Sequence, residues 1–138
     1  MNKKYYNIAK NTLFSINRSL TGRGVIKTLK IIQKEFPKIK IKRIKSGTKV
    51  FDWNIPPEWN VTYAYVLDKN GLKIIDFKKH NLHLVGYSTP LKKTLTKKDL
   101  FKNLYFLKNQ PEAIPYITSY YKKRWGFCVS YNKFKQFD

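Results

Sequence analysis

The side chains able to bind a metal ion are few in this sequence, which contains two histidines, one cysteine and eight Asp and Glu residues. The one close grouping with three possible ligands is Asp76, His80 and His83, and catalytic zinc sites typically use three protein ligands and a water. These residues fall on an expected turn, where their side chains do not converge as the two histidines of a helical HExxH motif do. We therefore predict no metal site here, and we interpret His83 as a structural histidine that donates to a backbone carbonyl.

Cys128 is the single candidate thiol nucleophile, and a catalytic thiol needs a nearby cation to lower its pKa. Its apolar neighbours Phe127 and Val129 favour a buried, inert thiol instead. No Ser-His-Asp or Cys-His arrangement has support in the sequence. A single cysteine excludes an internal disulfide and fits a reducing compartment, so we expect a cytoplasmic protein.

Arg124 and Trp125 follow Tyr120 and Tyr121, which places a cation among aromatic rings. This cation is suited to binding an anionic group of a substrate, or it stacks locally over a ring. The sequence leaves both readings open. Arg124, Trp125 and Tyr121 are nonetheless the best candidates for substrate-facing residues.

The net charge of +21 suggests a polyanionic partner such as a nucleic acid. Only four of the 29 basic residues are arginines, however, and arginine is the residue favoured for forked recognition of phosphate and guanine. The composition therefore argues against a dedicated nucleic-acid-binding protein. No stretch approaches the ~20 apolar residues of a membrane span, and the N-terminus lacks a signal-peptide pattern, so we expect no membrane partner.

Four segments combine glycine, aromatic and charged residues in a way that amphipathic periodicity alone does not produce: Leu13–Gly22, Ser46–Trp53, Asn81–Ser88 and Arg124–Cys128. Together, in this order, they resemble the N-terminal part of the aminopeptidase-like proteins often encoded in bacterial surface-polysaccharide biosynthesis clusters. Arg23 departs from the pattern, because an acidic residue is expected at that position. The residues that match the family motifs, without an assigned role, are Arg18, Ser19, Gly22, Asp52, Trp53, His83 and Gly126.

The resemblance implies a zinc-dependent aminopeptidase-type α/β domain that is interrupted near its start by a small β-rich insert. It also implies that the metal ligands and the catalytic carboxylate lie beyond Asp138, so that zinc is expected in a full-length relative and no cofactor in this chain. We expect the N-terminal fragment of a hydrolase, inactive alone, whose partner is the missing C-terminal part. The alternatives are a glycan- or peptide-binding module and, on charge alone, a nucleic-acid binder.

Apolar periodicity predicts the elements that must position these residues. We expect helices near residues 5–15 and 21–36, the second capped by Thr21, and a third over 96–107 behind a capping box at Thr96. Strands are expected over 39–44, 61–65, 72–77, 82–88 and 125–130, with a turn at Asn70-Gly71.

The fold class predicted is α/β, with segments 39–44 and 125–130 as neighbouring strands of one sheet. The expected organisation is residues 1–46 as the start of the aminopeptidase-like domain, 47–115 as the insert and 116–138 as the return to the sheet. Asp52 and Trp53 could line a ligand groove with Trp59, Tyr63 and Tyr65. We favour the alternative that these aromatic rings form the core of the insert.

Overall fold

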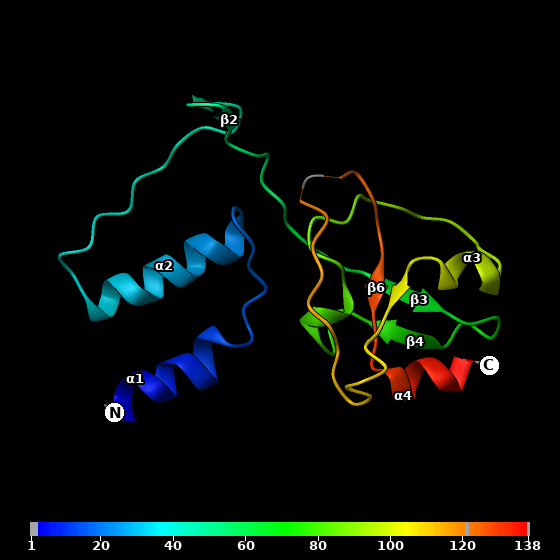
Figure 1. The fold of residues 1–138 in the computed structure, drawn as a ribbon. Coiled ribbons are helices and arrows are strands. Elements are labelled where there is room, and N and C mark those ends of the chain that lie inside the picture. The colour runs from blue at the N-terminus through cyan, green and yellow to red at the C-terminus, as the bar shows by residue number, and fades with distance from the viewer. Residues whose placement is uncertain (1–2, 121, 138) are drawn as a thin grey trace. The chain divides into compact units, whose positions relative to one another are not determined.

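The computed structural model describes residues 3–120 and 122–137, and the chain forms two compact units, Met1–Val61 and Thr62–Asp138. Both units combine helices with short strands (Figure 1). The mixed α/β class expected from the sequence is confirmed at this level. The finer division into residues 1–46, 47–115 and 116–138 stays a prediction.

Two helices make up the first part of unit Met1–Val61. Helix α1, Lys3–Ile8, continues into the π-helical turn η1, Ala9–Leu13, and helix α2 spans Arg23–Glu35. The Tyr5 and Phe36 rings stack with centroids 5.5 Å apart, and Lys4 pairs with Glu35 at 2.5 Å. Although α2 is 13 residues long, none of its residues is buried.

The start of α2 is capped by a side chain that is distant in the sequence. The prediction that Thr21 caps this helix is wrong, because the N-cap position is Gly22 and no side chain there caps the helix. The Arg23 N–H instead donates to Oδ1 of Asn60 at 2.7 Å, and the Thr21 hydroxyl donates to the Pro57 carbonyl at 3.2 Å. The segment around residues 57–60 therefore covers the first turn of α2.

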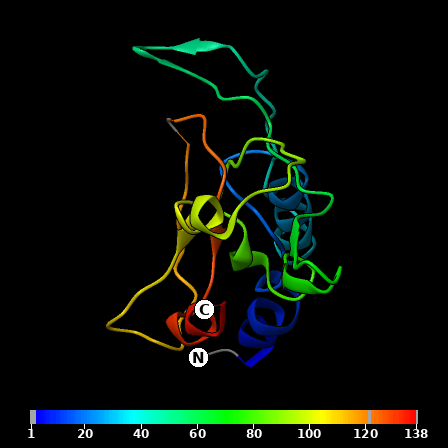
Figure 2. The same ribbon diagram turned by 90° about the vertical axis from the view of Figure 1, so that its right-hand side faces the viewer.

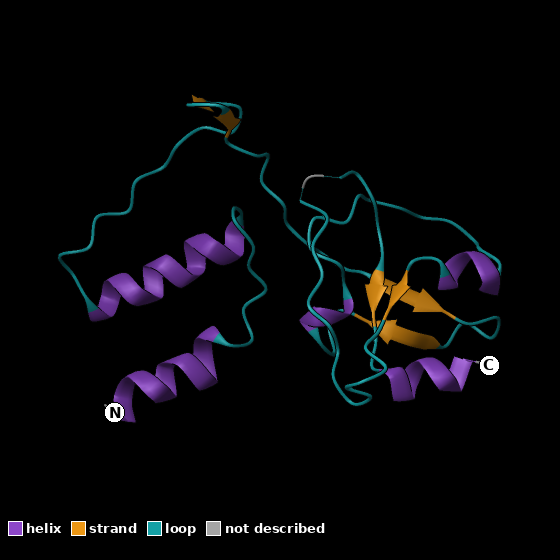
Figure 3. Cartoon of the chain, in the orientation of Figure 1, coloured by secondary structure: helices purple, strands orange, loops and turns teal. Residues whose placement is uncertain are grey.

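A small hairpin follows in the same unit, with β1 at Lys49–Val50 and β2 at Trp53–Asn54. The Gly47 N–H donates to the Ile55 carbonyl at 2.8 Å, which extends the pairing beyond the strands. Figures 1 and 2 show the hairpin reaching away from α2. The strand predicted over residues 39–44 is absent, because that stretch is extended without a described partner (Figure 3).

The second unit, Thr62–Asp138, opens with the predicted hairpin, which is confirmed. Strands β3, Tyr65–Leu67, and β4, Lys73–Asp76, pair antiparallel. The Asp68 carboxylate accepts from the backbone N–H groups of Asn70 and Leu72 at 2.9 and 2.8 Å. Gly71 has φ of +80°, the left-handed conformation that glycine adopts without strain.

The C-terminal part of this unit pairs in a way the sequence did not predict. Strand β6, Phe127–Cys128, runs parallel to β5, Leu104–Tyr105. The expectation that residues 125–130 lie beside residues 39–44 is therefore wrong. The strand expected over 82–88 reduces to the 3₁₀ turn η2, Asn81–His83, followed by single bridges from Leu84 to Phe127 and from Gly86 to Thr118.

Three short helical segments complete the unit. Helix α3 spans Lys97–Phe101 and begins with the predicted cap, since Thr96 Oγ1 accepts from the Asp99 N–H at 3.2 Å. It ends before the predicted residue 107, because Leu104 and Tyr105 pair with β6. Helix α4, Tyr131–Phe134, and the 3₁₀ turn η3, Lys135–Phe137, close the described chain.

The described hydrophobic core lies entirely in unit Thr62–Asp138. Ile75, Leu104 and Val129 form its centre, and partly buried aromatic rings from α3 and α4 pack against them. Val85 and Cys128 are likewise fully buried. Among the described residues, no helix has the length and apolar character that crossing a membrane requires.

Candidate functional site

Two of the motif segments meet in unit Thr62–Asp138 and form what we call the motif junction, residues 83–89, 117–119 and 124–128. The Val85 N–H donates to the Gly126 carbonyl at 3.1 Å, and the Thr89 N–H donates to the Arg124 carbonyl at 3.0 Å. Gly86 also bonds to residues 117–119. Its N–H donates to the Ile117 carbonyl at 2.8 Å, and its carbonyl accepts from the Ser119 N–H at 2.8 Å. The segments expected to share a role are thus bonded to one another.

Ser88 and Gly126 hold the centre of this junction. The buried Ser88 hydroxyl donates to the Val85 carbonyl at 2.7 Å and accepts from the Gly126 N–H at 3.3 Å. A Cβ at Gly126 would lie 2.7 Å from Cε2 of Tyr105 and 3.0 Å from the Asn103 carbonyl oxygen. A side chain here would require the Tyr105 ring to shift, so the close approach favours glycine.

His83 has the structural role that the sequence indicated. Its Nδ1 lies 2.7 Å from the Cys128 carbonyl oxygen, and because a carbonyl only accepts, Nδ1 carries the proton. Burial lowers the pKa of His83, and the carbonyl contact acts in the opposite direction. The buried imidazole is therefore a neutral donor that connects η2 to β6, and the prediction is confirmed.

Cys128 is an inert thiol in this environment. The residue is fully buried, and burial raises its pKa to about 11. Because the thiolate is the nucleophile and the metal ligand, such a group supplies neither function at neutral pH. The interpretation of Cys128 as a buried thiol is confirmed.

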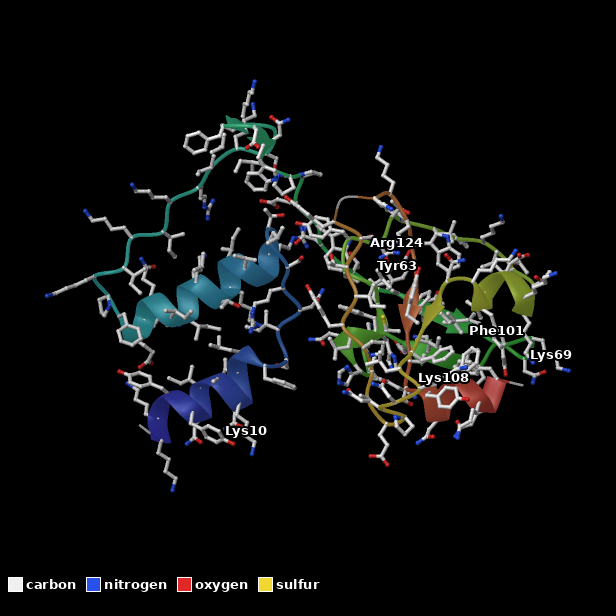
Figure 4. The ribbon with its side chains drawn as sticks, in the orientation of Figure 1. Lys10, Tyr63, Lys69, Phe101, Lys108 and Arg124 are labelled. Carbon is white, nitrogen blue, oxygen red and sulfur yellow. The ribbon has the colours of Figure 1, made fainter. Side chains whose placement is uncertain are left out.

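Arg124 stacks over an aromatic ring, which is one of the two alternatives that the sequence left open (Figure 4). Its guanidinium lies 5.5 Å from the centre of the Tyr105 ring, and Nη2 donates to the Thr118 carbonyl at 3.1 Å. Its Nε is buried without a hydrogen-bond partner among the described atoms. Trp125 lies edge-on to Phe127 with centroids 6.5 Å apart, and Tyr121 lies outside the described residues. The substrate-facing role of these three stays a prediction.

The side chains of Asp76 and His80 are already engaged elsewhere. Asp76 is bound by Lys73 at 3.3 Å and by the Lys78 N–H at 3.0 Å; mainly because of the latter contact, its pKa is lowered. His80 Nδ1 accepts from the Leu82 N–H at 3.2 Å. Within residues 3–120 and 122–137, no three His, Cys, Asp or Glu side chains are grouped so as to hold a metal ion. These residues therefore do not fit a zinc site.

The first motif lies in unit Met1–Val61 and shapes the entry to α2. Arg18 Nη1 donates to the Leu13 carbonyl at 2.5 Å, and Ser19 is half-buried. Gly22 is buried with φ of +109°, and a Cβ there would lie 2.5 Å from the Trp59 carbonyl oxygen. Arg23 is exposed at the helix start, where its backbone N–H is occupied by Asn60.

The second motif forms the β1–β2 hairpin, with Phe51 and Asp52 at its tip. Phe51 is 93% exposed with φ of +55°, and Trp53 is 40% exposed. In the second unit Tyr63 and Tyr65 are 68% and 41% exposed. The interpretation of these aromatic rings as a small core is therefore wrong, because the core is built from Ile75, Leu104 and Val129 with other rings. The single ligand groove proposed for them stays untested.

Asn60, Ser88 and Tyr105 are the residues that sequence reasoning missed. Each acts on a segment at a distance along the chain: Asn60 caps α2, Ser88 binds Gly126, and Tyr105 lies under Arg124. No spacing rule connects such positions. A glycine within the Arg124–Cys128 strand pattern was the available signal, since glycine in a strand often marks close backbone approach.

Comparison with known proteins places this geometry in a family. The chain belongs to the family described as "Domain of unknown function (DUF2172)", whose pattern matches residues 58–138, more than half of its length. It is also 50% identical over 131 residues to a Clostridium acetobutylicum protein named "Putative polysaccharide biosynthesis protein with aminopeptidase-like domain". That match spans 95% of this chain and 30% of the relative.

A solved structure gives the same result. A crystal structure of a "putative peptidase" from Clostridium acetobutylicum is 49% identical and superposes with a TM-score of 0.92 over 96% of this chain. The chain corresponds to 31% of that protein, so it spans about a third of the length of either relative. The resemblance to the N-terminal part of aminopeptidase-like proteins is thereby confirmed.

Proposed function

We propose that this chain is a non-catalytic N-terminal portion of a zinc-dependent aminopeptidase-like hydrolase of polysaccharide biosynthesis. One observation carries the proposal. The chain is 50% identical, over 95% of its own length, to a protein with an aminopeptidase-like domain of which it covers 30%. The zinc ligands and the catalytic carboxylate would come from the part of such a protein that this match does not include.

The chemistry of the described residues supports this division of roles. His83 donates to a carbonyl, the Asp76 carboxylate is bound by Lys73 and a backbone N–H, and Cys128 keeps its proton. Asp76 and Cys128 would have to give up these contacts or this proton to bind a metal ion, and no three His, Cys, Asp or Glu side chains are grouped in the described part of the chain. No step of peptide hydrolysis is therefore assigned to these groups.

The contribution of the chain would be structural, with one candidate contact to substrate. The motif junction holds the backbone of Arg124 just before strand β6 begins, since the Thr89 N–H donates to the Arg124 carbonyl. The half-buried guanidinium of Arg124 is a candidate donor for an anionic group such as a carboxylate. Tyr105 and the Thr118 carbonyl would hold the guanidinium in place.

Hydrolysis of aminoacyl-p-nitroanilides by the purified 138-residue chain, with and without added zinc, tests the proposal. We expect no release of nitroaniline above the rate of a matched chain carrying His80→Ala and His83→Ala. Zinc-dependent hydrolysis that disappears in the double variant would contradict the proposal, because it would locate a metal site within this chain.

A glycan-binding module is the second candidate function, and the exposed tyrosines of unit Thr62–Asp138 favour it. Tyr63 and Tyr65 stack with centroids 5.9 Å apart, and Lys73 lies 4.6 Å above the Tyr65 ring. Exposed aromatic faces of this kind suit the apolar faces of sugar rings. Figure 4 shows the position of Tyr63.

Binding of the chain to a panel of immobilised oligosaccharides, measured for two matched variants, tests this second function. Tyr63 and Tyr116 are exposed to nearly the same degree, at 68% and 69%. We expect Tyr63→Ala to abolish binding and Tyr116→Ala to leave it intact. Equal binding by both variants, or none by the unaltered chain, would remove this candidate.

A further inference from the structure

Residues 38–45, which we call the open segment, have the sequence of a strand without the pairing of one. They read Lys-Ile-Lys-Ile-Lys-Arg-Ile-Lys, with lysine and isoleucine alternating over the first five positions. Alternation of this kind is typical of a half-buried strand. The segment is nevertheless extended and exposed except at Ile41, and Ile44 is 63% exposed (Figure 3).

The backbone hydrogen bonds show where the pairing is missing. The Ile39 N–H donates to the Phe36 carbonyl at 3.0 Å, and its carbonyl accepts from Nε2 of Gln33 at 2.7 Å. At the other end, the Lys45 carbonyl accepts from the Thr48 N–H at 3.2 Å. Between them, the backbone groups of residues 40–44 have no partner in the described chain. A row of free N–H and C=O groups on a β-patterned segment is a template for strand addition.

Helix α2, in the same unit, likewise lacks a buried face. One of its faces carries a trough of about 460 Å³ lined by two isoleucines and four basic residues. The lining residues are Arg23, Ile26, Lys27, Lys30, Ile31 and Lys34. Since no α2 residue is buried, this helix lacks the packing that a helix of an α/β layer normally has.

We propose that the open segment pairs with an acidic, apolar-patterned strand from the remaining part of an aminopeptidase-like protein. The inference rests on the proposed function, and it specifies the partner: alternating aliphatic and carboxylate side chains in an extended conformation. Pairing with one strand would satisfy the backbone groups of every second residue in 40–44 and bury Ile39 and Ile41 on one face. The relatives have room for such a strand, since about two thirds of their length lies outside the match.

The positive charge of unit Met1–Val61 favours an acidic strand over a second copy of the chain as the partner. Residues 1–61 contain 14 Lys and Arg against three Asp and Glu. Two open segments paired with each other would bring their lysines into cross-strand contact, and like charges in that position are destabilising. Carboxylates on the partner would reverse the sign of each such contact.

Hydrogen exchange measured by mass spectrometry on two proteins tests the proposal. One is the 138-residue chain, and the other is a full-length chimaera in which this chain replaces the matching part of the Clostridium acetobutylicum protein. We expect the amides of residues 40–44 to exchange freely in the chain and every second one of them to be protected ~100-fold or more in the chimaera. Free exchange in both proteins would overturn the proposal. Protection in the chain that grows with its concentration would also overturn it, since it would indicate self-pairing.

Matched charge reversals in the chimaera separate strand pairing from general destabilisation. Lys40→Glu with Lys42→Glu should reduce the protection of residues 40–44, whereas Lys92→Glu with Lys93→Glu, at exposed positions of the other unit, should leave it unchanged. Equal effects of the two pairs would contradict the proposal. Zinc content of the chimaera is read separately: protected amides without bound zinc count against the proposed function, and bound zinc with unprotected amides counts against the strand proposal.

Discussion

Gly126→Ala should destabilise unit Thr62–Asp138 strongly, although it adds only one methyl group. The new Cβ would lie 2.7 Å from Cε2 of Tyr105, 3.0 Å from the Asn103 carbonyl oxygen and 3.1 Å from Cγ2 of Val85. Val85 is fully buried, and the Asn103 carbonyl accepts the Phe127 N–H at 2.9 Å. Only the Tyr105 ring is able to move, and its movement would disturb the stacking with Arg124.

The expected cost follows from these contacts. Overpacking a core by one methyl group costs about 1–3 kcal/mol, and loss of a cation–π contact adds about 0.5–1 kcal/mol. The lower entropy of the unfolded alanine chain offsets roughly 0.4–1 kcal/mol. The net loss is about 2 kcal/mol, which lowers the midpoint of a domain of this size by ~10 °C.

Differential scanning calorimetry of three proteins provides the assay: the unaltered chain, Gly126→Ala and the control Gly86→Ala. Gly86 is also at the motif junction, but its Cβ would lie no nearer than 3.3 Å to any atom, with Oγ1 of the exposed Thr118 at 3.3 Å and the Ile117 carbonyl oxygen at 3.6 Å. We expect the control to lower the midpoint far less. Equal midpoints for the two variants would refute the reasoning, since Gly126 would then not be enclosed by β5 and the core.

Three further predictions follow from single contacts. Gly24→Ala should lower the urea midpoint of α2 measured by circular dichroism, because the new Cβ would overlap the Asn17 carbonyl oxygen. Helix propensity alone predicts the opposite, a gain in stability of up to ~1 kcal/mol. A higher midpoint would therefore contradict the close contact between Gly24 and Asn17. Cys128 should react with a thiol reagent at pH 8 only after unfolding in urea, since burial raises its pKa to about 11, and rapid labelling of the native chain would be inconsistent with burial. Burial lowers the pKa of His83 below its usual 6.5, so the unfolded chain takes up the proton at a higher pH than the folded chain does. The stability that this group contributes is therefore complete above pH 6.5 and decreases as the pH falls below 6.5. Urea titrations between pH 7.5 and 5.5 should show this loss in the unaltered chain and a smaller one in His83→Gln; the same slope in both would assign it to other groups.

Local chemistry made some elements predictable from the sequence. The Asn70-Gly71 turn specifies the β3–β4 hairpin through Asp68 and the positive φ of Gly71. Thr96 begins α3 as its capping pattern indicated, and His83 donates to a carbonyl as expected. In each case the determining residues are close in sequence or have one dominant role.

Pairings across long sequence distances were not predictable in the same way. The periodicity of residues 100–107 favours a helix, but Leu104 and Tyr105 join β6, and no local pattern reports that partner. Asn60 caps α2 from 37 residues away. The open segment shows the converse, because its sequence has a strand pattern although its residues 40–44 have no backbone partner in the described chain.

The same limit applies to the candidate site. The motif residues His83 and Gly126 are brought together with Ser88 and Arg124 by backbone bonds that their spacing does not reveal. The aromatic residues expected in a core are exposed, since aromatic content alone does not distinguish a core from a surface. Their exposure is what supports the second candidate function.

Zinc uptake by the 138-residue chain is the most direct measurement of the proposed division of roles. The chain would be incubated with excess zinc, separated by gel filtration and analysed for metal by plasma mass spectrometry. We predict no stoichiometric zinc, because no three His, Cys, Asp or Glu side chains are grouped so as to hold a metal ion within the described residues. One zinc per chain, lost in His80→Ala with His83→Ala, would contradict the conclusion that the metal ligands lie outside these residues.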